Sequence, residues 1–246
     1  MDQHFLVDGK VVGRLVEAAE VNDLDVVVDV GAGTGVISEK LARKAFRVYA
    51  VEADPAMLPY LARLQNQHSN LQVFISNFLT AKLPPYNKVV ANPPFSILEP
   101  LVQLHLRKPT TMSLLAPSRF AERLAAKQDS LLTFKVSLAY DVRVLERFDG
   151  DVLDPPYPGK VCHLVLKPVE RGFAEKLMLE FLSRRTSKVR NALRNVFWTY
   201  MNKRQATRLV ELSPLRENVL NKPVRRLDYC EAEEIYRLIR RQVLNI

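Results

Sequence analysis

A run of β-branched residues that ends in a glycine-rich segment constrains the fold of this chain most strongly. Residues 26–30 (Val-Val-Val-Asp-Val) are followed directly by Gly31-Ala32-Gly33-Thr34-Gly35. A continuous apolar run of this length is typical of a strand buried on both faces of a parallel sheet. Glycines lack side chains, so the backbone after such a strand can pass close to a ligand where a helix begins. The segment predicts a strand, a tight turn with a binding site, and a helix over residues 36–45.

Alternating strand and helix patterns continue beyond this unit. Apolar runs predict strands over residues 47–51, 71–75, 88–91, 111–116 and 136–144, and a last run over 161–166 is expected to pair antiparallel. Helical spacing of apolar residues lies between these runs, over residues 56–67, 100–106 and 120–126. This order predicts an α/β fold with a doubly wound sheet, in which ligands bind at the carboxyl ends of the strands.

The C-terminal part of the chain follows a different pattern. Beyond Pro168 the strand signals stop, and apolar residues recur at intervals of three and four, as in helices. They are Phe173, Leu177, Phe181, Val189, Leu193, Val196 and Phe197. Asp228 followed by Glu231 resembles a capping box and predicts the start of a last helix. We therefore expect an α/β domain over residues 1–168 and a small helical domain over residues 169–246.

Positive charge is concentrated in the expected helical domain. The chain carries 36 Lys and Arg residues against 27 Asp and Glu residues, a net charge of +9. Residues 1–168 hold 19 basic and 18 acidic side chains, whereas residues 169–246 hold 17 and 9. Lys and Arg displace counterions from a phosphate backbone, so this distribution favours a nucleic acid as partner. A solvated basic helix surface is the alternative that charge alone leaves open.

Cysteine, histidine and hydropathy patterns indicate the compartment. Cys162 and Cys230 lie far apart with no CxxC pair, and the four histidines are scattered. Such spacing builds neither a disulfide framework nor a zinc site, so we expect a reducing compartment and no metal. No run approaches the ~18 to 20 apolar residues that cross a bilayer, and the first four residues are not the basic start of a signal peptide. We expect a cytoplasmic monomer that does not bind membranes.

Candidate residues for a nucleoside ligand follow the expected strands. Glu52 lies 21 residues after Gly31, where a carboxylate can accept hydrogen bonds from both ribose hydroxyls. A solvated acid beside Asp54 is the alternative. Asn77 follows the third strand and is expected to hydrogen-bond an adenine edge, with Phe78 covering the ring. The third glycine comes one position too early for the dinucleotide fingerprint, which favours a ligand without pyrophosphate.

The segment Asn92-Pro93-Pro94-Phe95 directly follows the strand expected over residues 88–91. Consecutive prolines cannot extend a central strand, so they fix a rigid turn that aims the Asn92 carboxamide oxygen and a backbone carbonyl at one point. The segment matches [DNS]-P-P-[YFW], the motif of enzymes that methylate exocyclic amino groups. Two acceptors on the N–H bonds of an adenine amino group draw its nitrogen toward a nucleophilic geometry, while Phe95 stacks on the base. An ordinary proline-rich turn is the alternative.

Together these motifs resemble the ribosomal RNA adenine N6-dimethyltransferases, the small-subunit dimethyladenosine transferases and macrolide-resistance methylases. The G-x-G-x-G spacing is similar to that of class I S-adenosylmethionine-dependent methyltransferases. Gln3-His4-Phe5-Leu6 is similar to the opening Q-[NH]-F-L of the family, residues 120–124 to its E-F-A-E-R-L helix, residues 156–161 to its P-x-P-K-V loop, and residues 184–193 to its basic helix. The resemblance implies a doubly wound class I methyltransferase sheet with a small C-terminal helical RNA-binding domain.

The resemblance also implies roles for individual residues. S-adenosylmethionine would be held by Gln3, His4, Leu6, Gly31, Gly33, Gly35, Glu52, Ala53, Asn77, Phe78 and Asn92. Catalytic roles fall on Asn92, Pro93 and Phe95, and RNA contacts on Arg184, Arg185, Lys188, Arg190, Arg194 and Tyr157. The implied reaction is in-line transfer of the sulfonium methyl group to adenine N6 of ribosomal RNA or of a small ribosomal subunit precursor, with two methyl groups added and no metal.

The chain differs from the usual family residues at four places. It has Asn92-Pro93-Pro94-Phe95 for N-L-P-Y, Asn77 for Asp, Leu153 for the Phe of F-x-P-x-P, and Pro117-Ser118 for Gln-Lys. These differences leave two alternative interpretations open. The protein could be a paralogue that adds one methyl group or has another target, or a non-catalytic RNA-binding factor for ribosome assembly. A DNA adenine N6-methyltransferase is a further alternative, but the basic helical domain contains no obvious module that enters a major groove.

Overall fold

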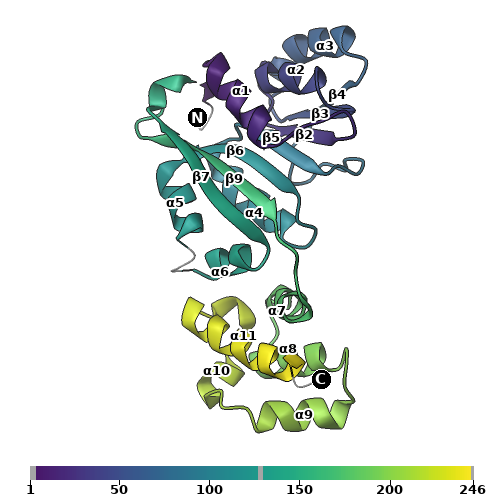
Figure 1. Ribbon diagram of the computed structural model, residues 1–246, viewed down its shortest axis with the longest axis vertical. Coiled ribbons are helices and arrows are strands. Elements are labelled where there is room, and N and C mark those ends of the chain that lie inside the picture. The colour runs from purple at the N-terminus through teal and green to yellow at the C-terminus, as the bar shows by residue number, and fades with distance from the viewer. Residues whose placement is uncertain (1–3, 127–129, 245–246) are drawn as a thin grey trace. The chain divides into compact units, whose positions relative to one another are not determined.

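The computed structural model describes residues 4–126 and 130–244 of the chain (Figure 1). The chain forms two units, Met1–Ala125 with Asp141–Pro168, and Ala126–Tyr140 with Val169–Ile246. The first unit holds the sheet and the second is helical. Residues 130–140, which the sequence analysis placed in the α/β domain, belong to the helical unit, since Phe134 and Leu138 join its apolar core.

The first unit is built on a mixed seven-stranded sheet with the order β4-β3-β2-β5-β6-β9-β7. The strands are β2 (Val26–Val30), β3 (Arg47–Glu52), β4 (Leu71–Ile75), β5 (Lys88–Ala91), β6 (Thr111–Pro117), β7 (Tyr140–Phe148) and β9 (Val161–Pro168). Neighbours from β4 to β6 pair in parallel, whereas β9 pairs antiparallel with β6. The predicted doubly wound α/β sheet is confirmed, with the antiparallel strand that the sequence indicated.

The strand order places a switch point between β2 and β5. From β2 the chain moves outward to β3 and β4, and it then returns to the other side of β2 as β5 and β6. The segments that follow β2 and β5 therefore diverge at adjacent carboxyl ends, which is where open α/β sheets bind ligands. Those two segments are the glycine turn and the Asn-Pro-Pro-Phe turn.

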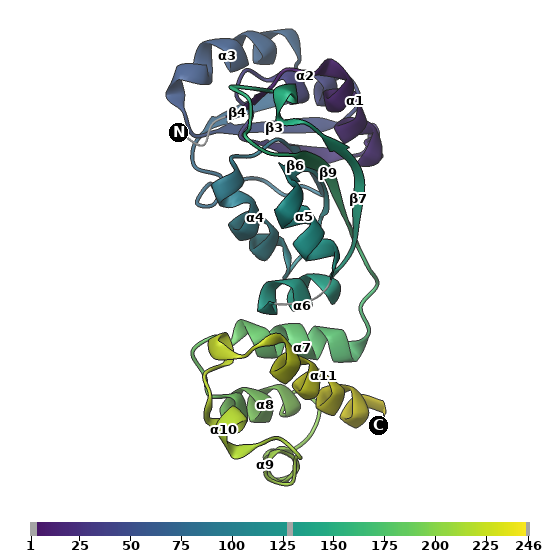
Figure 2. The ribbon, with the colours of Figure 1, turned by 90° about the vertical axis from the view of Figure 1, so that its left-hand side faces the viewer.

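Helices cover both faces of the sheet (Figures 1 and 2). They are α1 (Gly9–Ala18), α2 (Val36–Ala42), α3 (Leu58–Gln67), α4 (Leu98–His105) and α5 (Ser118–Ala125), with short 3₁₀ turns η1 (Pro55–Met57), η2 (Phe95–Ile97) and η3 (Gly150–Val152). Because parallel crossovers are right-handed, α2 and α3 lie on the face opposite to α4. Strand β1 (Phe5–Leu6) pairs antiparallel with β8 (Leu153–Asp154) in a separate two-stranded ladder.

Two parts of the first unit differ from the sequence expectation. No element was predicted before residue 26, but helix α1 lies in this region and begins after Asp8. The Asp8 carboxylate caps the helix by accepting hydrogen bonds from the amides of Lys10 and Val11. The strand expected over residues 136–144 is wrong in its first part, because residues 136 and 137 end helix α6 (Leu131–Ser137). Ser130 and Thr133 form a capping box at its start, and this local cap outweighs the strand propensity of Val136.

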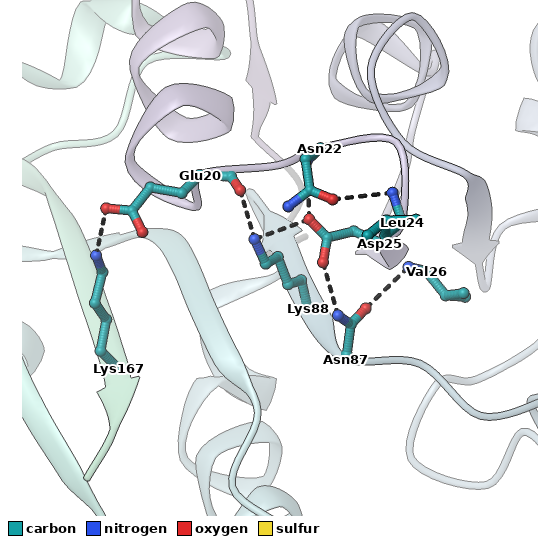
Figure 3. A network of polar contacts seen from close by, with 8 residues as sticks. All are labelled: Glu20, Asn22, Leu24, Asp25, Val26, Asn87, Lys88 and Lys167. Carbon is teal, nitrogen blue, oxygen red and sulfur yellow. Dashed lines mark hydrogen bonds and ion pairs between the residues drawn. The ribbon is translucent and has the colours of Figure 1, made fainter.

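A polar network fixes the amino ends of β2 and β5 (Figure 3). Lys88 forms an ion pair of 2.9 Å with Asp25, and both side chains are largely buried. Asn87 donates to the other Asp25 oxygen at 2.7 Å and accepts from the amide of Val26 at 2.9 Å. Burial opposes ionisation of Asp25, but hydrogen bonds from Lys88, Asn22 and Asn87 and the Lys88 charge hold its pKa below the usual value. The network sets the register of the strands whose other ends form the site.

The second unit packs its helices around one apolar core. They are α6, α7 (Phe173–Ser183), α8 (Val189–Phe197), α9 (Lys203–Glu211), α10 (Glu217–Asn221), the 3₁₀ turn η4 (Val224–Arg226) and α11 (Tyr229–Leu244). The predicted apolar positions of α7 and α8 lie in this core, apart from Phe173, which is exposed. Asp228 and Glu231 form the predicted capping box of α11, since each side chain accepts from the amide of the other at 2.8 and 3.0 Å. The periodicity of the C-terminal part therefore predicted its core correctly.

Candidate active site

The glycine turn after β2 is held against the end of β3. The amides of Gly31 and Ala32 both donate to the Val51 carbonyl oxygen, at 2.8 and 3.1 Å. Gly31 has a φ of 71°, and a Cβ atom at this position would lie 2.8 Å from Cδ of Pro94. Because Gly31 has no side chain, the glycine turn and the Asn-Pro-Pro-Phe turn come into contact at the switch point.

Glu52 extends from the end of β3 across the glycine turn. Its Oε2 accepts a hydrogen bond of 2.8 Å from the amide of Gly33, and its Oε1 accepts one of 2.9 Å from the amide of Asp54. The side chain is buried, with 7% exposed. Glu52 is therefore a fixed, buried carboxylate. The alternative interpretation of Glu52 as a solvated acid does not fit the structure. Each of its oxygens keeps a lone pair for a further donor.

A pocket of about 280 Å³ opens between the two turns. It is lined by His4, Phe5, Leu6, Gly31, Ala32, Gly33, Thr34, Val36, Ile37, Glu52, Ala53, Asp54, Asn92 and Pro94. The structure thus brings together most of the residues expected to hold a cofactor. Gly35, Asn77 and Phe78 do not line this pocket, and Gln3 lies outside the described residues. Phe5, Val36 and Ile37 add apolar walls that sequence reasoning did not single out.

The side chain of Asn92 has a defined orientation in the pocket wall. Its Nδ2 donates a hydrogen bond of 2.8 Å to the backbone carbonyl oxygen of His4. That oxygen can only accept, so the amide nitrogen must face it and Oδ1 must face the other way. Oδ1 is buried and has no hydrogen-bond partner among the described residues. A buried acceptor without a donor is costly in free energy, and a ligand N–H would remove that cost.

Three aromatic rings gather beside Asn92. The imidazole of His4 stacks on Phe95 with centroids 5.9 Å apart, and Tyr157 contacts both rings edge-on at 5.7 and 5.0 Å. His4 also donates through Nδ1 to the carbonyl oxygen of Pro155 at 2.7 Å. The pairing of β1 with β8 brings these segments together, although 151 residues separate His4 from Pro155. Phe95 and Tyr157 therefore both pack against His4, whose backbone carbonyl oxygen holds the Asn92 side chain.

Asn77 and Phe78 occupy other surroundings. Asn77 is exposed, and its Oδ1 accepts from the amide of Leu79 at 2.9 Å. Phe78 is buried and stacks on His105 with centroids 6.2 Å apart, and the Tyr86 hydroxyl lies 2.9 Å from His105 Nε2. Burial lowers the pKa of His105 and raises that of Tyr86, which favours the neutral form of both groups. Asn77 thus closes a turn, and Phe78 belongs to a packed aromatic group.

Asp29 is a buried acid behind the glycine turn that the sequence analysis did not single out. Ser38 donates to its Oδ2 at 2.7 Å, and its Oδ1 has no partner among the described residues. Burial, with a smaller contribution from the charge of Glu52, raises the pKa of Asp29 to about 7. The signal was present in the sequence as one acidic residue inside a run of valines.

The basic residues proposed for RNA contact fall into two groups. Arg184 pairs with Glu180 at 2.8 Å, Arg194 pairs with Glu211 at 3.2 Å, and Arg190 pairs with Glu217. The Nε atoms of these three arginines are buried and have no partner within the described part of the chain. By contrast, Arg185 and Lys188 are exposed, and no ion pair is found for either one among the described residues.

Two further features concern metals and membranes. Within residues 4–126 and 130–244, no three His, Cys, Asp or Glu side chains gather as they would around a metal ion. None of the helices described in this part of the chain is long and apolar enough to span a bilayer. Cys162 is buried and Cys230 is exposed, and both are free thiols.

The sheet order, with the glycine turn at its switch point, defines a Rossmann-like class I methyltransferase fold. The structure matches that of a dimethyladenosine transferase from Plasmodium falciparum with a TM-score of 0.64 and 20% identity, over 94% of this chain and 96% of the other. It matches the 23S rRNA methyltransferase ErmE with a TM-score of 0.64 and 21% identity, over 96% and 99% of the two chains. The predicted fold class is confirmed, including the helical C-terminal region.

The family model for ribosomal RNA adenine dimethylases matches residues 1–241, and the chain belongs to this family. It is 31% identical over 207 residues to the probable ribosomal RNA small subunit methyltransferase A of Methanococcoides burtonii, covering 78% of this chain and 76% of that protein. It is 33% identical over 205 residues to the ribosomal RNA small subunit methyltransferase A of Thermotoga maritima, covering 79% and 72%. The resemblance stated from the sequence is confirmed, and the protein is an enzyme of this methyltransferase family.

Proposed function

We propose that this protein transfers two methyl groups from S-adenosylmethionine to N6 of adenine in small-subunit ribosomal RNA. One observation carries the assignment to this pocket. Asn92 presents a buried oxygen without a partner at the pocket wall, and the His4 carbonyl oxygen holds the other end of its amide. A hydrogen-bond donor such as an adenine amino group is what this oxygen lacks.

The residues of the pocket suit the methyl donor. The Glu52 carboxylate, fixed by two backbone amides, retains lone pairs for the ribose hydroxyls. Gly31 and Gly33 line the pocket with their backbone, where the amino-acid part would lie, and Leu6 and Ile37 supply apolar contact. When bound, the donor supplies an electrophilic methyl group on a cationic sulfur, so the protein needs no acid to activate the leaving group.

The protein's part in the reaction is positioning and polarisation. Asn92 Oδ1 accepts a hydrogen bond from the adenine N–H and increases electron density on N6, while the backbone near Pro93 supplies a second acceptor. His4 stacks on one face of Phe95 and Tyr157 makes a T-shaped contact with the ring at 5.0 Å, so the base would stack on the other face of Phe95. For each transfer the new N–C bond replaces the S–C bond of the donor, the demethylated thioether product leaves, and N6 releases one proton to water. Asn92, Pro93 and Phe95 are thus the proposed catalytic residues.

The proposal leaves Gly35, Asn77 and Phe78 in supporting roles. Gly35 precedes α2 with a φ of 88° and packs against Leu64, so it shapes the turn. Asn77 and Phe78 order the segment after β4, and we propose that the adenine ring of the donor contacts this segment. The helical unit is the proposed RNA-binding domain because it holds nearly all of the net positive charge of the chain.

Transfer of label tests the proposal. Wild-type protein, Asn92→Ala and Asn77→Ala are incubated with methyl-labelled S-adenosylmethionine and under-methylated small ribosomal subunits. We expect label in the RNA with the wild type, a loss of at least ~100-fold with Asn92→Ala, and a smaller effect with Asn77→Ala, because Asn77 does not line the pocket. RNA binding without transfer by the wild type would instead support the non-catalytic assembly factor.

A further inference from the structure

A groove of about 670 Å³ is present in the helical unit. It is lined by residues of two segments that are distant in sequence. The first segment runs from Leu209 at the end of α9 to Arg216 before α10, and the second runs from Glu234 to Gln242 within α11. None of the lining residues belongs to the pocket at the switch point of the sheet. The groove is therefore a second concave surface, which the proposed function does not use.

Leucines form the apolar part of the groove. Leu209, Leu212 and Leu215 come from the first segment, and Leu238 comes from α11. Leu215 and Leu238 are buried in the core of the helical unit, against which Leu209 packs, whereas Leu212 is 74% exposed. A single exposed leucine is ordinary, but this one lines a concave surface that is continuous with the apolar core. A partner that covers the groove would remove this apolar area from water.

The lining residues of α11 extend over two turns of the helix. Glu234, Leu238 and Gln242 recur at intervals of four residues, and Arg237 and Arg241 do the same beside them. At 1.5 Å per residue, this stripe is about 12 Å long. An amphipathic helix that docks in a groove places its apolar anchors at i, i+3 or i+4, and i+7, which covers a similar length. The stripe on α11 therefore suits a helix as partner.

The charged residues of the groove are mostly cationic. Arg216, Arg237 and Arg241 line it, together with one acid, Glu234. Arg216 and Arg241 are exposed, and neither forms an ion pair with another of the described residues. Arg237 pairs with Glu233 at 2.8 Å, but both side chains reach solvent, which screens the pair. The rim of the groove is therefore positive and complements a partner that carries carboxylates.

We infer that this groove binds an acidic amphipathic helix of a partner protein. The leucines receive the apolar face of that helix, and the arginines pair with carboxylates on its flanks. Leucine side chains offer no hydrogen bond to a phosphate backbone, which disfavours RNA as the occupant. The net charge of +9 opposes association with a second copy of the chain. The inference adds a protein-binding surface to an enzyme whose proposed function is methyl transfer.

A synthetic peptide tests the inference. The probe is a fluorescently labelled peptide of about 20 residues, because shorter helices are marginal in water. It carries leucines at helical spacing on one face and glutamates on the flanking positions. A second peptide has the same composition in an order that forms no apolar face. Each peptide is titrated with the full-length protein, and a photoreactive group in the peptide identifies the residues that it contacts.

Two variants alter the groove, and each has a matched control. The groove variants are Leu212→Ser and Arg237→Ser/Arg241→Ser. Leu24→Ser is the apolar control, since Leu24 is 83% exposed and lies outside the groove. Arg204→Ser/Arg208→Ser is the charge control, since both arginines occupy exposed positions of α9 that do not line the groove. Thermal unfolding of each variant establishes that the protein is intact.

We expect the amphipathic peptide to bind the wild type and to cross-link to residues 209–216 or 234–242. Leu212→Ser should weaken this binding at least ~5-fold because an apolar contact is lost. The arginine variant should weaken it at least ~5-fold at low salt and less at high salt. Both controls should bind as the wild type does. Absence of binding, equal binding of the peptide without an apolar face, or equal losses with the controls overturns the inference.

Ribosomal RNA is the alternative occupant of the groove, and the same proteins test it. Small-subunit RNA is titrated with the wild type, the arginine variant and the charge control. If the arginine variant weakens RNA binding more than its control does, while Leu212→Ser leaves peptide binding unchanged, the groove contacts RNA and the inference is wrong. Leu212→Ser should keep wild-type methyl transfer to RNA, because Leu212 does not line the pocket at the switch point.

Discussion

The amide nitrogen of Asn92 lies 2.8 Å from the backbone carbonyl oxygen of His4. This hydrogen bond determines which end of the Asn92 side chain is available to a substrate. It also links the N-terminal segment to the Asn-Pro-Pro-Phe turn. The imidazole of the same His4 donates to the Pro155 carbonyl oxygen, which ties this segment to the chain that follows β8. The N-terminal strand β1 is therefore a structural part of the proposed active site as well as a wall of the pocket.

Replacing Asn92 by Asp separates the two ends of this side chain. Asp keeps an acceptor for the adenine amino group but has no N–H for the His4 carbonyl oxygen, so one of its oxygens would face that oxygen with the same sign of charge. We predict that Asn92→Asp lowers kcat/KM at least ~100-fold, with the protein still folded. Methyl-transfer kinetics on small-subunit RNA measure this, and near-normal activity would show that the His4 contact does not orient the group.

Gly31→Ala tests the contact between the two turns. The new Cβ atom would lie 2.8 Å from Pro94, and a φ of 71° is strained for alanine. We predict a loss of roughly 1–3 kcal/mol in the free energy of unfolding and at least ~10-fold weaker binding of S-adenosylmethionine. Gly9→Ala is the control, since no atom lies within 4 Å of its Cβ position. Denaturant unfolding and calorimetric titration measure both quantities, and equal behaviour of the two variants would count against the described contact.

Asp29 lowers the free energy of unfolding as the pH rises, whereas an acid with a lowered pKa raises it. Its pKa in the folded protein is about 7, above the ordinary value, so the folded state binds more protons than the unfolded state between pH ~4 and ~7. This group's contribution to stability is greatest below pH ~4 and is lost as the pH rises toward 7. We predict that the free energy of unfolding of Asp29→Asn rises by a few kcal/mol relative to that of the wild type as the pH is raised from 5 to 8. Denaturant unfolding at each pH measures this difference. A constant difference across this range would contradict the assignment.

Lys88→Met tests the network in Figure 3. It leaves the buried carboxylate of Asp25 without the cation that lies 2.9 Å away, which should cost about 3–5 kcal/mol near pH 7. The folded-state pKa of Asp25 is lowered, so the stabilisation is present above pH ~4 and is lost as the pH falls through that folded pKa. Wild type and variant should therefore converge in acid.

Lys167→Met is the matched control for that measurement. Lys167 pairs with Glu20 at 2.6 Å, but the Glu20 side chain is 72% exposed and solvent screens the pair, so the loss should be far smaller than that of Lys88→Met. Equal losses for the two lysine variants would mean that burial does not distinguish the two pairs.

The sequence predicted the parts of the fold that depend on local pattern. Strand β2 and its glycine turn were recognised from a run of adjacent residues, and α11 from the capping box of Asp228 and Glu231. Helix α6 was missed because the β-branched Val136 favours a strand, whereas the Ser130 cap and packing around Phe134 decide for a helix. The strand propensity of a single residue therefore counts for less than a helix cap combined with an apolar helix face that is buried.

Contacts between distant segments were beyond sequence reasoning. Asn92, Gly31 and Glu52 were expected near one another because each follows a strand of one sheet. The contact of Asn92 with His4 joins residues 88 positions apart and depends on the pairing of β1 with β8. The ion pairs of Arg190 and Arg194 likewise depend on how α8 packs against its neighbours, so sequence could not separate them from exposed cations such as Arg185.

Mass analysis of nucleosides tests the central claim most directly. Under-methylated small-subunit ribosomal RNA is incubated with S-adenosylmethionine and either wild-type protein or Asn92→Ala, and the RNA is then digested and analysed. The account predicts N6,N6-dimethyladenosine with the wild type and at least ~100-fold less with the variant. No methylated adenosine with active, folded wild-type protein, or undiminished product with Asn92→Ala, would contradict it.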